Sequence, residues 1–188
     1  NFGLLHLLNS STLVSIIIGI LLLDLVGAYL PHLVQHKVKL LWYIHIVHHT
    51  DQKVDTTTAN RHHPFESIVR FIFTLAGIFI AGAPIGLVLM YQSLSVIFSQ
   101  FNHANIQISD KVDKALSYLI VSPNMHKVHH HFELPYTDSN YGNIFSLWDR
   151  LFGTYMELSK SEIIYGVDTD LDEIKNSKFN SLIERPFK

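Results

Sequence analysis

Long uncharged, apolar stretches alternate along the chain with polar segments that contain histidine. Residues 13–23 carry no charge and are nearly all aliphatic, and residues 67–108 contain a single charged side chain, Arg70. Such stretches are typical of helices that cross a bilayer, because a soluble helix of this length normally keeps a polar face. The pattern predicts spans at about 12–35, 67–82 and 85–102, with a Gly/Pro-rich turn between the last two.

The polar remainder, residues 36–66 and 103–188, is predicted to form a helical cap on one side of the membrane. Within it, residues 40–49 read as a helix at the interface, and an amphipathic helix runs from Asp110 to Ser122-Pro123. All 14 Lys and Arg residues lie in 37–70 or 111–188, so the positive-inside rule places the cap in the cytoplasm. We therefore expect an all-α integral membrane protein that forms one domain over residues 1–188.

Composition limits the chemistry that the chain can carry. It has no cysteine, which excludes disulfides, thiolate ligands and protein-held iron-sulfur clusters. The net charge of -2 and the absence of a basic run give no indication of nucleic acid as a partner. Any metal must therefore be held by nitrogen and oxygen ligands.

Histidines recur at helical spacing in four places. Two triplets share the pattern His-x-x-His-His, in which positions i, i+3 and i+4 fall on one face of a helix, so each triplet is expected to form one imidazole cluster. A pair four residues apart and one single histidine complete the set. Nine imidazoles are too many for one four-coordinate zinc and suit two metal ions with open positions, such as a pair of irons that binds and reduces dioxygen. The nine candidate ligands are His32, His36, His45, His48, His49, His103, His126, His129 and His130.

Two features of the first span also bear on function. Asp24 lies mid-span, where a carboxylate is costly, so it is a candidate both for a structural role and for one beside the metal site. Pro31 should kink the helix by releasing the carbonyl of Gly27 from its usual hydrogen bond. The isolated His6, His62 and His131 are interpreted as surface or hydrogen-bonded residues.

At these positions the chain resembles the fatty acid hydroxylase/sterol desaturase superfamily of membrane di-iron enzymes, in its bacterial branch. The chain departs from the family in two ways. Leu33 stands after the first box histidine, where many members have an arginine. The chain has three predicted spans where the family usually has four, as expected if a fourth is missing upstream. The motifs that carry the resemblance are His32-x-x-x-His36, Leu41-Trp42-x-x-His45-x-x-His48-His49, Arg61-x-His63-Pro64, Asn102-His103-Ala104-Asn105, Met125-His126-x-x-His129-His130, Asn140-Tyr141-Gly142 and Trp148-Asp149-Arg150-Leu151-Phe152-Gly153-Thr154-Tyr155.

The resemblance implies O2-dependent hydroxylation or desaturation of an unactivated C–H bond in a lipid drawn from the bilayer. It implies two Fe ions, with zinc as a substitute in purified protein, O2 as co-substrate, and an external electron donor of ferredoxin, cytochrome or reductase type. Such chemistry suits an apolar pocket that opens to the bilayer and keeps water away. Candidates to support the ligands are Asp24, Asn102, Asn105, Asp138 and Asp149, and His63 is a candidate further ligand or gate.

Other classes of histidine-rich protein are alternatives to a lipid hydroxylase. A histidine-rich membrane protein that binds or transports metal without oxygenase activity would also place imidazoles near spans, although transport predicts ligands at mid-membrane. A bis-histidine haem protein would leave seven histidines unexplained, and a zinc hydrolase is disfavoured because His-Glu-x-x-His does not occur. The sequence favours the bacterial cell membrane over the endoplasmic reticulum. It leaves the oligomeric state and the choice among sterol, carotenoid, fatty acyl, sphingoid and ether-lipid substrates open.

Overall fold

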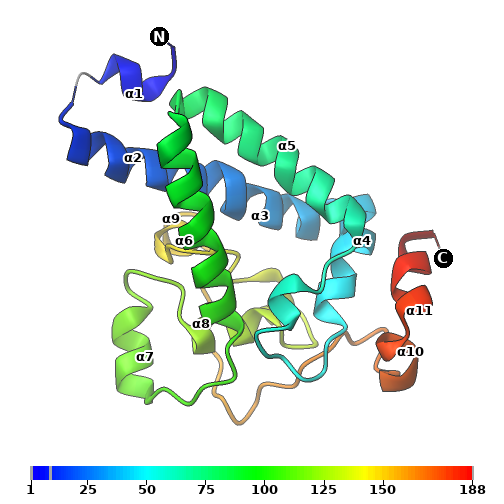
Figure 1. Cartoon of the computed structure of the whole chain (residues 1–188). Coiled ribbons are helices and arrows are strands. Elements are labelled where there is room, and N and C mark those ends of the chain that lie inside the picture. Colours follow the sequence, from blue (N-terminus) through cyan, green and yellow to red (C-terminus); the bar gives the residue numbers. More distant parts are fainter. Residues whose placement is uncertain (1, 9, 188) are drawn as a thin grey trace.

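A computed structural model describes residues 2–8 and 10–187, which are mainly helical and contain no named β-strand. Three of the helices are long and apolar enough to cross a membrane: Thr12–Lys37, Pro64–Ala81 and Ile85–His103. These bounds lie within a few residues of those of the three predicted spans. Apart from α1 (Leu4–Leu7), which lies beside the tip of the hairpin, the short helices gather at one end of the long ones, where they form the expected cap (Figure 1).

The first span is continuous but not uniformly α-helical. It consists of α2 (Thr12–Asp24), the π-helical segment η1 (Leu25–Tyr29) and α3 (Leu30–Lys37). The wider π turn lies directly before Pro31, where the sequence predicted a kink, and it accommodates the missing N–H of proline. Because a π turn inserts an extra residue, it also resets the face that α3 presents to the cap.

The second and third spans form a hairpin of α5 (Pro64–Ala81) and α6 (Ile85–His103). Gly82 ends α5 in the left-handed region with φ of 65°, and its N–H donates to the carbonyl of Ile78. A Cβ at this position would meet the carbonyl oxygen of Phe2 in the segment that leads into α1 (Leu4–Leu7). Only glycine therefore fits the tip, from which α5 and α6 diverge in Figure 1.

The cap is made of short elements joined by ordered loops. The amphipathic helix predicted to run from Asp110 to Ser122 is shorter than expected, because α7 ends at Leu116 and turns follow it. The cap elements are α4 (Lys39–His49), η2 (Thr58–Asn60), α7 (Asp110–Leu116), α8 (Pro123–His129), η3 (Tyr136–Asp138), α9 (Leu147–Leu151), α10 (Glu173–Ser177), α11 (Phe179–Glu184) and η4 (Arg185–Phe187).

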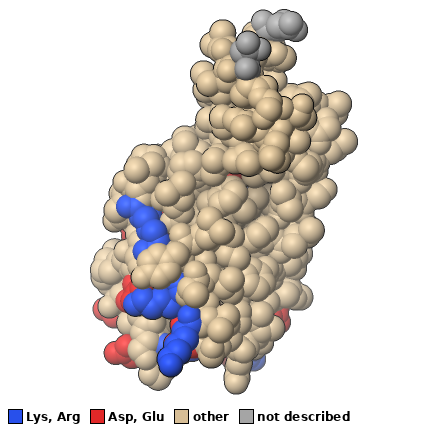
Figure 2. All heavy atoms as spheres, turned by 90° about the vertical axis from the view of Figure 1, so that its left-hand side faces the viewer, with Lys and Arg blue, Asp and Glu red and all other residues tan. Residues whose placement is uncertain are grey.

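Charge is distributed as a membrane protein requires. On the face in Figure 2, the Lys, Arg, Asp and Glu side chains gather in the lower part of the molecule, over the cap, and the upper part shows almost none. Large apolar side chains such as Phe71, Phe79, Leu89 and Ile97 are exposed on α5 and α6. They would face lipid chains, with the cap beyond the hydrocarbon region.

Asp24 joins the first span to the cap. It is fully buried, and its carboxylate accepts hydrogen bonds from the backbone N–H of Ile144 (3.3 Å) and Phe145 (3.2 Å) and from Nε1 of Trp148 (2.9 Å). Two of these donors precede α9 and the third, Trp148, lies within it. The carboxylate therefore has a structural role at this junction.

Replacing Asp24 with alanine should destabilise the fold by about 3 kcal/mol or more, because each buried donor left without an acceptor costs roughly 1–3 kcal/mol. The measurement is the thermal unfolding midpoint of the purified protein in detergent. Asp24→Asn keeps an acceptor oxygen and should lower the unfolding midpoint much less. Equal midpoints for the alanine variant and the unaltered chain would contradict this role.

Candidate metal centre

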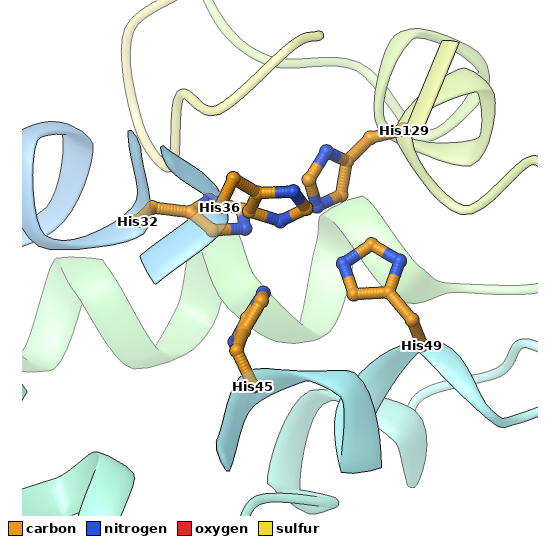
Figure 3. Close-up of side chains that lie close together, drawn as sticks. All are labelled: His32, His36, His45, His49 and His129. Carbon is orange, nitrogen blue, oxygen red and sulfur yellow. The ribbon is translucent and has the colours of Figure 1, made fainter. Parts of the chain in front are cut away.

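Two groups of histidines lie where the long helices meet the cap. Within each group the potential ligand atoms all lie within 4.8 Å of one another. In Figure 3 the rings of the first group point inward from α3, α4 and α8 toward a common centre. The structure thus brings together all nine histidines that the sequence singled out. Group one is His32, His36, His45, His49 and His129, and group two is His48, His103, His126 and His130.

Each triplet is divided between the two groups, which differs from the expectation of one cluster per triplet. In α4, His45 and His49 face group one and His48 faces group two. In the second triplet, at the end of α8, His129 faces group one, whereas His126 and His130 face group two. Helical geometry explains the division, because positions i and i+4 differ by about 40° around the axis and positions i+3 and i+4 by about 100°. Two helices therefore serve both groups.

Group two is arranged around the Nε2 atom of His103. That atom lies 3.2 Å from Nε2 of His48, 3.1 Å from Nε2 of His126 and 3.2 Å from Nε2 of His130. The other ring nitrogen of His103 donates to the carbonyl of Ser99 (2.8 Å), so Nε2 carries a lone pair. Nitrogens about 3 Å apart match the edges of a coordination shell with metal–nitrogen bonds of roughly 2.0–2.1 Å. The residues of group two therefore fit a divalent transition metal.

In group one, hydrogen bonds to the outer ring nitrogens likewise leave the inner nitrogens free to bind a metal. Nδ1 of His32 donates to the carbonyl of Tyr141 (2.8 Å) and Nδ1 of His129 to the carbonyl of Ser139 (2.7 Å). A carbonyl can only accept, so these contacts fix the tautomer and leave each Nε2 as a free ligand atom. The Nε2 atoms of all five group-one histidines are buried and have no hydrogen-bond partner. A bound cation would satisfy them.

Electrostatics favour the neutral, metal-binding form of the rings in the cap. Burial, reinforced by the neighbouring imidazoles, keeps the pKa of His48, His49, His126, His129 and His130 well below the usual value. Protons therefore do not compete for the ligand atoms near neutral pH.

Among the carboxylates proposed to support the ligands, Asp138 is the one that contacts a histidine of the two groups, His36. Its Oδ1 lies 3.2 Å from Nδ1 of His36, and Lys37 Nζ donates to its Oδ2 (2.6 Å). Burial acts to raise the pKa of Asp138, but these two contacts outweigh it and hold the pKa below the ordinary value. The ionised carboxylate can accept the outer N–H of His36 and orient that ring.

The other proposed residues do not contact the histidine groups. Asp149 accepts hydrogen bonds from the backbone N–H of Tyr141 and Gly142 and so shapes the loop whose carbonyls hold His32 and His129. Asn102 donates to the carbonyl of Asn143, and Asn105 is exposed. Together with Asp24, these residues support the loops and helices around the site.

His63 lies outside both groups. Its Nδ1 accepts the N–H of Phe65 as the N-cap of α5, and its Nε2 donates to the carbonyl of Ile183 in α11. Because both ring nitrogens bind the backbone, the side chain holds the C-terminal helices against the start of α5.

Glu66, which no sequence motif singled out, is fully buried in the first turn of α5. Its Oε1 lies 3.1 Å from Nδ1 of His45, 3.0 Å from Nδ1 of His62 and 3.8 Å from Nη1 of Arg70. His62 stacks on the ring of His48 at 4.6 Å and donates to the carbonyl of Ala59 (3.0 Å). The sequence feature that could have indicated this residue is its position, three residues after His63 and at the predicted membrane boundary.

Glu66→Gln should weaken metal retention in group one about 10- to 100-fold, the usual cost of losing a group that orients a ligating histidine. The measurement is the metal left on the purified protein over a series of chelator concentrations. Asp170→Asn is the matched control, since it alters a largely buried carboxylate that pairs with Lys175 and Arg185 and belongs to neither histidine group. Unchanged retention in the Glu66 variant would contradict the prediction.

These features define a membrane protein with two histidine clusters able to hold metal ions. Residues 16–154 match the model of the fatty acid hydroxylase family, so the chain belongs to this family. This confirms the resemblance stated from the histidine motifs.

Curated relatives agree with this assignment. The chain is 24% identical over 140 residues to ornithine lipid hydroxylase of Rhizobium tropici, covering 74% of this chain and 41% of that one. It is 30% identical over 145 residues to alkylglycerol monooxygenase of Danio rerio and 28% identical over 145 residues to the enzyme of Caenorhabditis elegans. These alignments cover 75% and 76% of this chain but 30% and 27% of the relatives, so the chain spans well under half of their length. No solved structure matches it significantly.

Proposed function

We propose that the chain is the metal-binding part of an O2-dependent di-iron hydroxylase that acts on a membrane lipid. The observation that carries the proposal is the convergence of nine imidazoles, eight of them on buried residues, in two groups of five and four. Imidazole suits iron, and two adjacent sites with more than one open position suit dioxygen chemistry. When bound, the two irons would supply the binding and reduction of dioxygen.

The residues of the chain hold and shield this centre. Carbonyls of the 139–141 loop and the carboxylates of Asp138 and Glu66 orient the ligating rings, and burial excludes water from the groups. In hydroxylation, one atom of O2 enters the C–H bond of the lipid and the other leaves as water, with two electrons and two protons consumed. A chain without cysteine must take these electrons from an external donor of ferredoxin, cytochrome or reductase type.

The location of the protein is part of the proposal. Its three apolar helices support integral membrane placement, and the positive-inside rule supports a site on the cytoplasmic face. A bacterial relative, the ornithine lipid hydroxylase, supports the bacterial cell membrane over the endoplasmic reticulum.

The test is incubation of the iron-loaded full-length protein in membranes with a reductant and isotopically labelled 18O2, followed by mass spectrometry of the lipids. Hydroxylation predicts one 18O atom in a lipid product. A product that has lost two hydrogens without gaining 18O would indicate desaturation instead. Bound metal without any oxidised lipid would overturn the proposal and favour a metal-binding or metal-transport protein.

A further inference from the structure

A polar hollow lies between the hairpin and the histidines, in two adjoining parts. Its outer part has a volume of about 170 Å³ and lies between η2, α5 and α6, lined mainly by Asn60, His62, Arg70, Ser95, Ser99 and Gln100. Its inner part, of about 40 Å³, reaches His32, His45, His48, His103 and His126. The two parts share His62, Arg70 and Ser99 in their walls, so they lie next to each other. This lining differs from the apolar pocket that the sequence led us to expect.

The inner part is too small for an acyl chain. A volume of about 40 Å³ has room for only a few water molecules, since one water needs roughly 10–15 Å³ of such space. Two side chains in its wall have unpaired polar atoms, Nε2 of Gln35 and Oδ1 of Asn102, although these residues are only 2% and 1% exposed. Buried polar groups normally have partners, so the cavity suits a ligand group that both accepts and donates hydrogen bonds.

Arg70 stands where the outer and inner parts meet. It is the one charged residue in 67–108, and its side chain is 41% exposed. The nearest carboxylate oxygen, that of Glu66, is 3.8 Å away and is shared with His45 and His62. No described residue accepts a hydrogen bond from the Arg70 guanidinium. A planar guanidinium with free N–H groups at a membrane boundary is suited to bind a phosphate or carboxylate.

We propose that this hollow is the head-group subsite for the lipid substrate. Arg70 binds an anionic oxygen of the head group, and Gln35 and Asn102 bind the polar linkage beside it. The acyl chains stay outside, against exposed apolar residues near the mouth such as Phe71, Val96 and Ile97. The carbon presented to the histidines then lies within a few bonds of the head group. The position at which the lipid is hydroxylated rests on the proposed hydroxylase function, whereas the preference of the hollow for an anionic head group does not.

Binding is tested on the metal-loaded, detergent-solubilised full-length protein by native mass spectrometry. The probes are a lysophosphatidic acid, a monoacylglycerol with the same chain, and inorganic phosphate. We expect the unaltered protein to prefer the anionic lipid over the neutral one by at least tenfold. Arg70→Gln should abolish this preference and Arg70→Lys retain part of it. Lys39→Gln, which changes an exposed cation that does not line the hollow, should leave it intact.

Metal content is measured in parallel to separate lipid binding from disturbance of Glu66. Loss of preference in Arg70→Gln at unchanged metal content supports the subsite. An unchanged preference in that variant, or displacement of the lipid by equimolar inorganic phosphate, would overturn it. In turnover experiments, a hydroxyl near the head group supports the subsite, and one at the far end of the chain overturns it. A preserved preference without turnover in the unaltered protein would instead refute the hydroxylase function.

Discussion

Replacing His129 with alanine is expected to abolish product formation while the protein stays in the membrane. Its ring is central to group one, with ring centroids 4.5 Å from those of His32 and His49 and 4.7 Å from that of His36. Its Nδ1 is held by the carbonyl of Ser139, so Nε2 is directed into the group. The loss should exceed the 10- to 100-fold effect of removing a group that only orients a ligand. Labelled-oxygen turnover in isolated membranes measures it.

The matched control for this variant is His131→Ala. His131 lies two residues further along and is also buried, but its Nδ1 accepts the backbone N–H of Ile164 and it belongs to neither group. We expect the His131→Ala protein to be less stable than the unaltered protein but still to form product. Retained turnover in the His129 variant would remove that residue from the proposed ligands.

His103→Ala should have the largest effect on metal binding. All three short nitrogen–nitrogen contacts of group two converge on Nε2 of His103, and its replacement reduces that group from four imidazoles to three. Group one keeps its five. We therefore expect the metal of group two to be lost to a chelator at concentrations at least 100-fold lower than in the unaltered protein, with product formation abolished. Metal analysis during chelator titration measures this loss.

The two groups give this prediction a direct check. One metal should leave the His103 variant early, and the other should leave at the same chelator concentration as in the unaltered protein. Simultaneous loss of both metals, or no change in either, would contradict separate sites.

The sequence was sufficient to predict the spans and the nine histidines because both depend on local periodicity. Apolar length predicts a span, and the i, i+3, i+4 spacing predicts which side chains share a helix face. Local periodicity does not determine how α4 and α8 are rotated against α3 and α6. That rotation, set by tertiary packing, divides each triplet between the two groups.

The supporting contacts were less predictable for the same reason. Asp138 contacts His36, one of the proposed ligands, whereas Asp24 and Asp149 bind backbone N–H groups in the 141–145 segment and Trp148 or Thr154. The carbonyls of Ser139 and Tyr141, which fix His129 and His32, have no signature in the sequence because every residue has a carbonyl. Glu66 was overlooked because it follows a polar loop, and only the packing of α5 against α4 brings it to His45.

The measurement that tests the central claim most directly is the number of metal ions per chain. The native protein should be purified without chelator, and its iron and zinc content should be compared with the protein concentration from amino-acid analysis. Two metal ions per chain, with iron in both positions in the active protein, is the result that we predict. One ion or none in fully folded, active protein would contradict a two-metal centre built from these nine histidines.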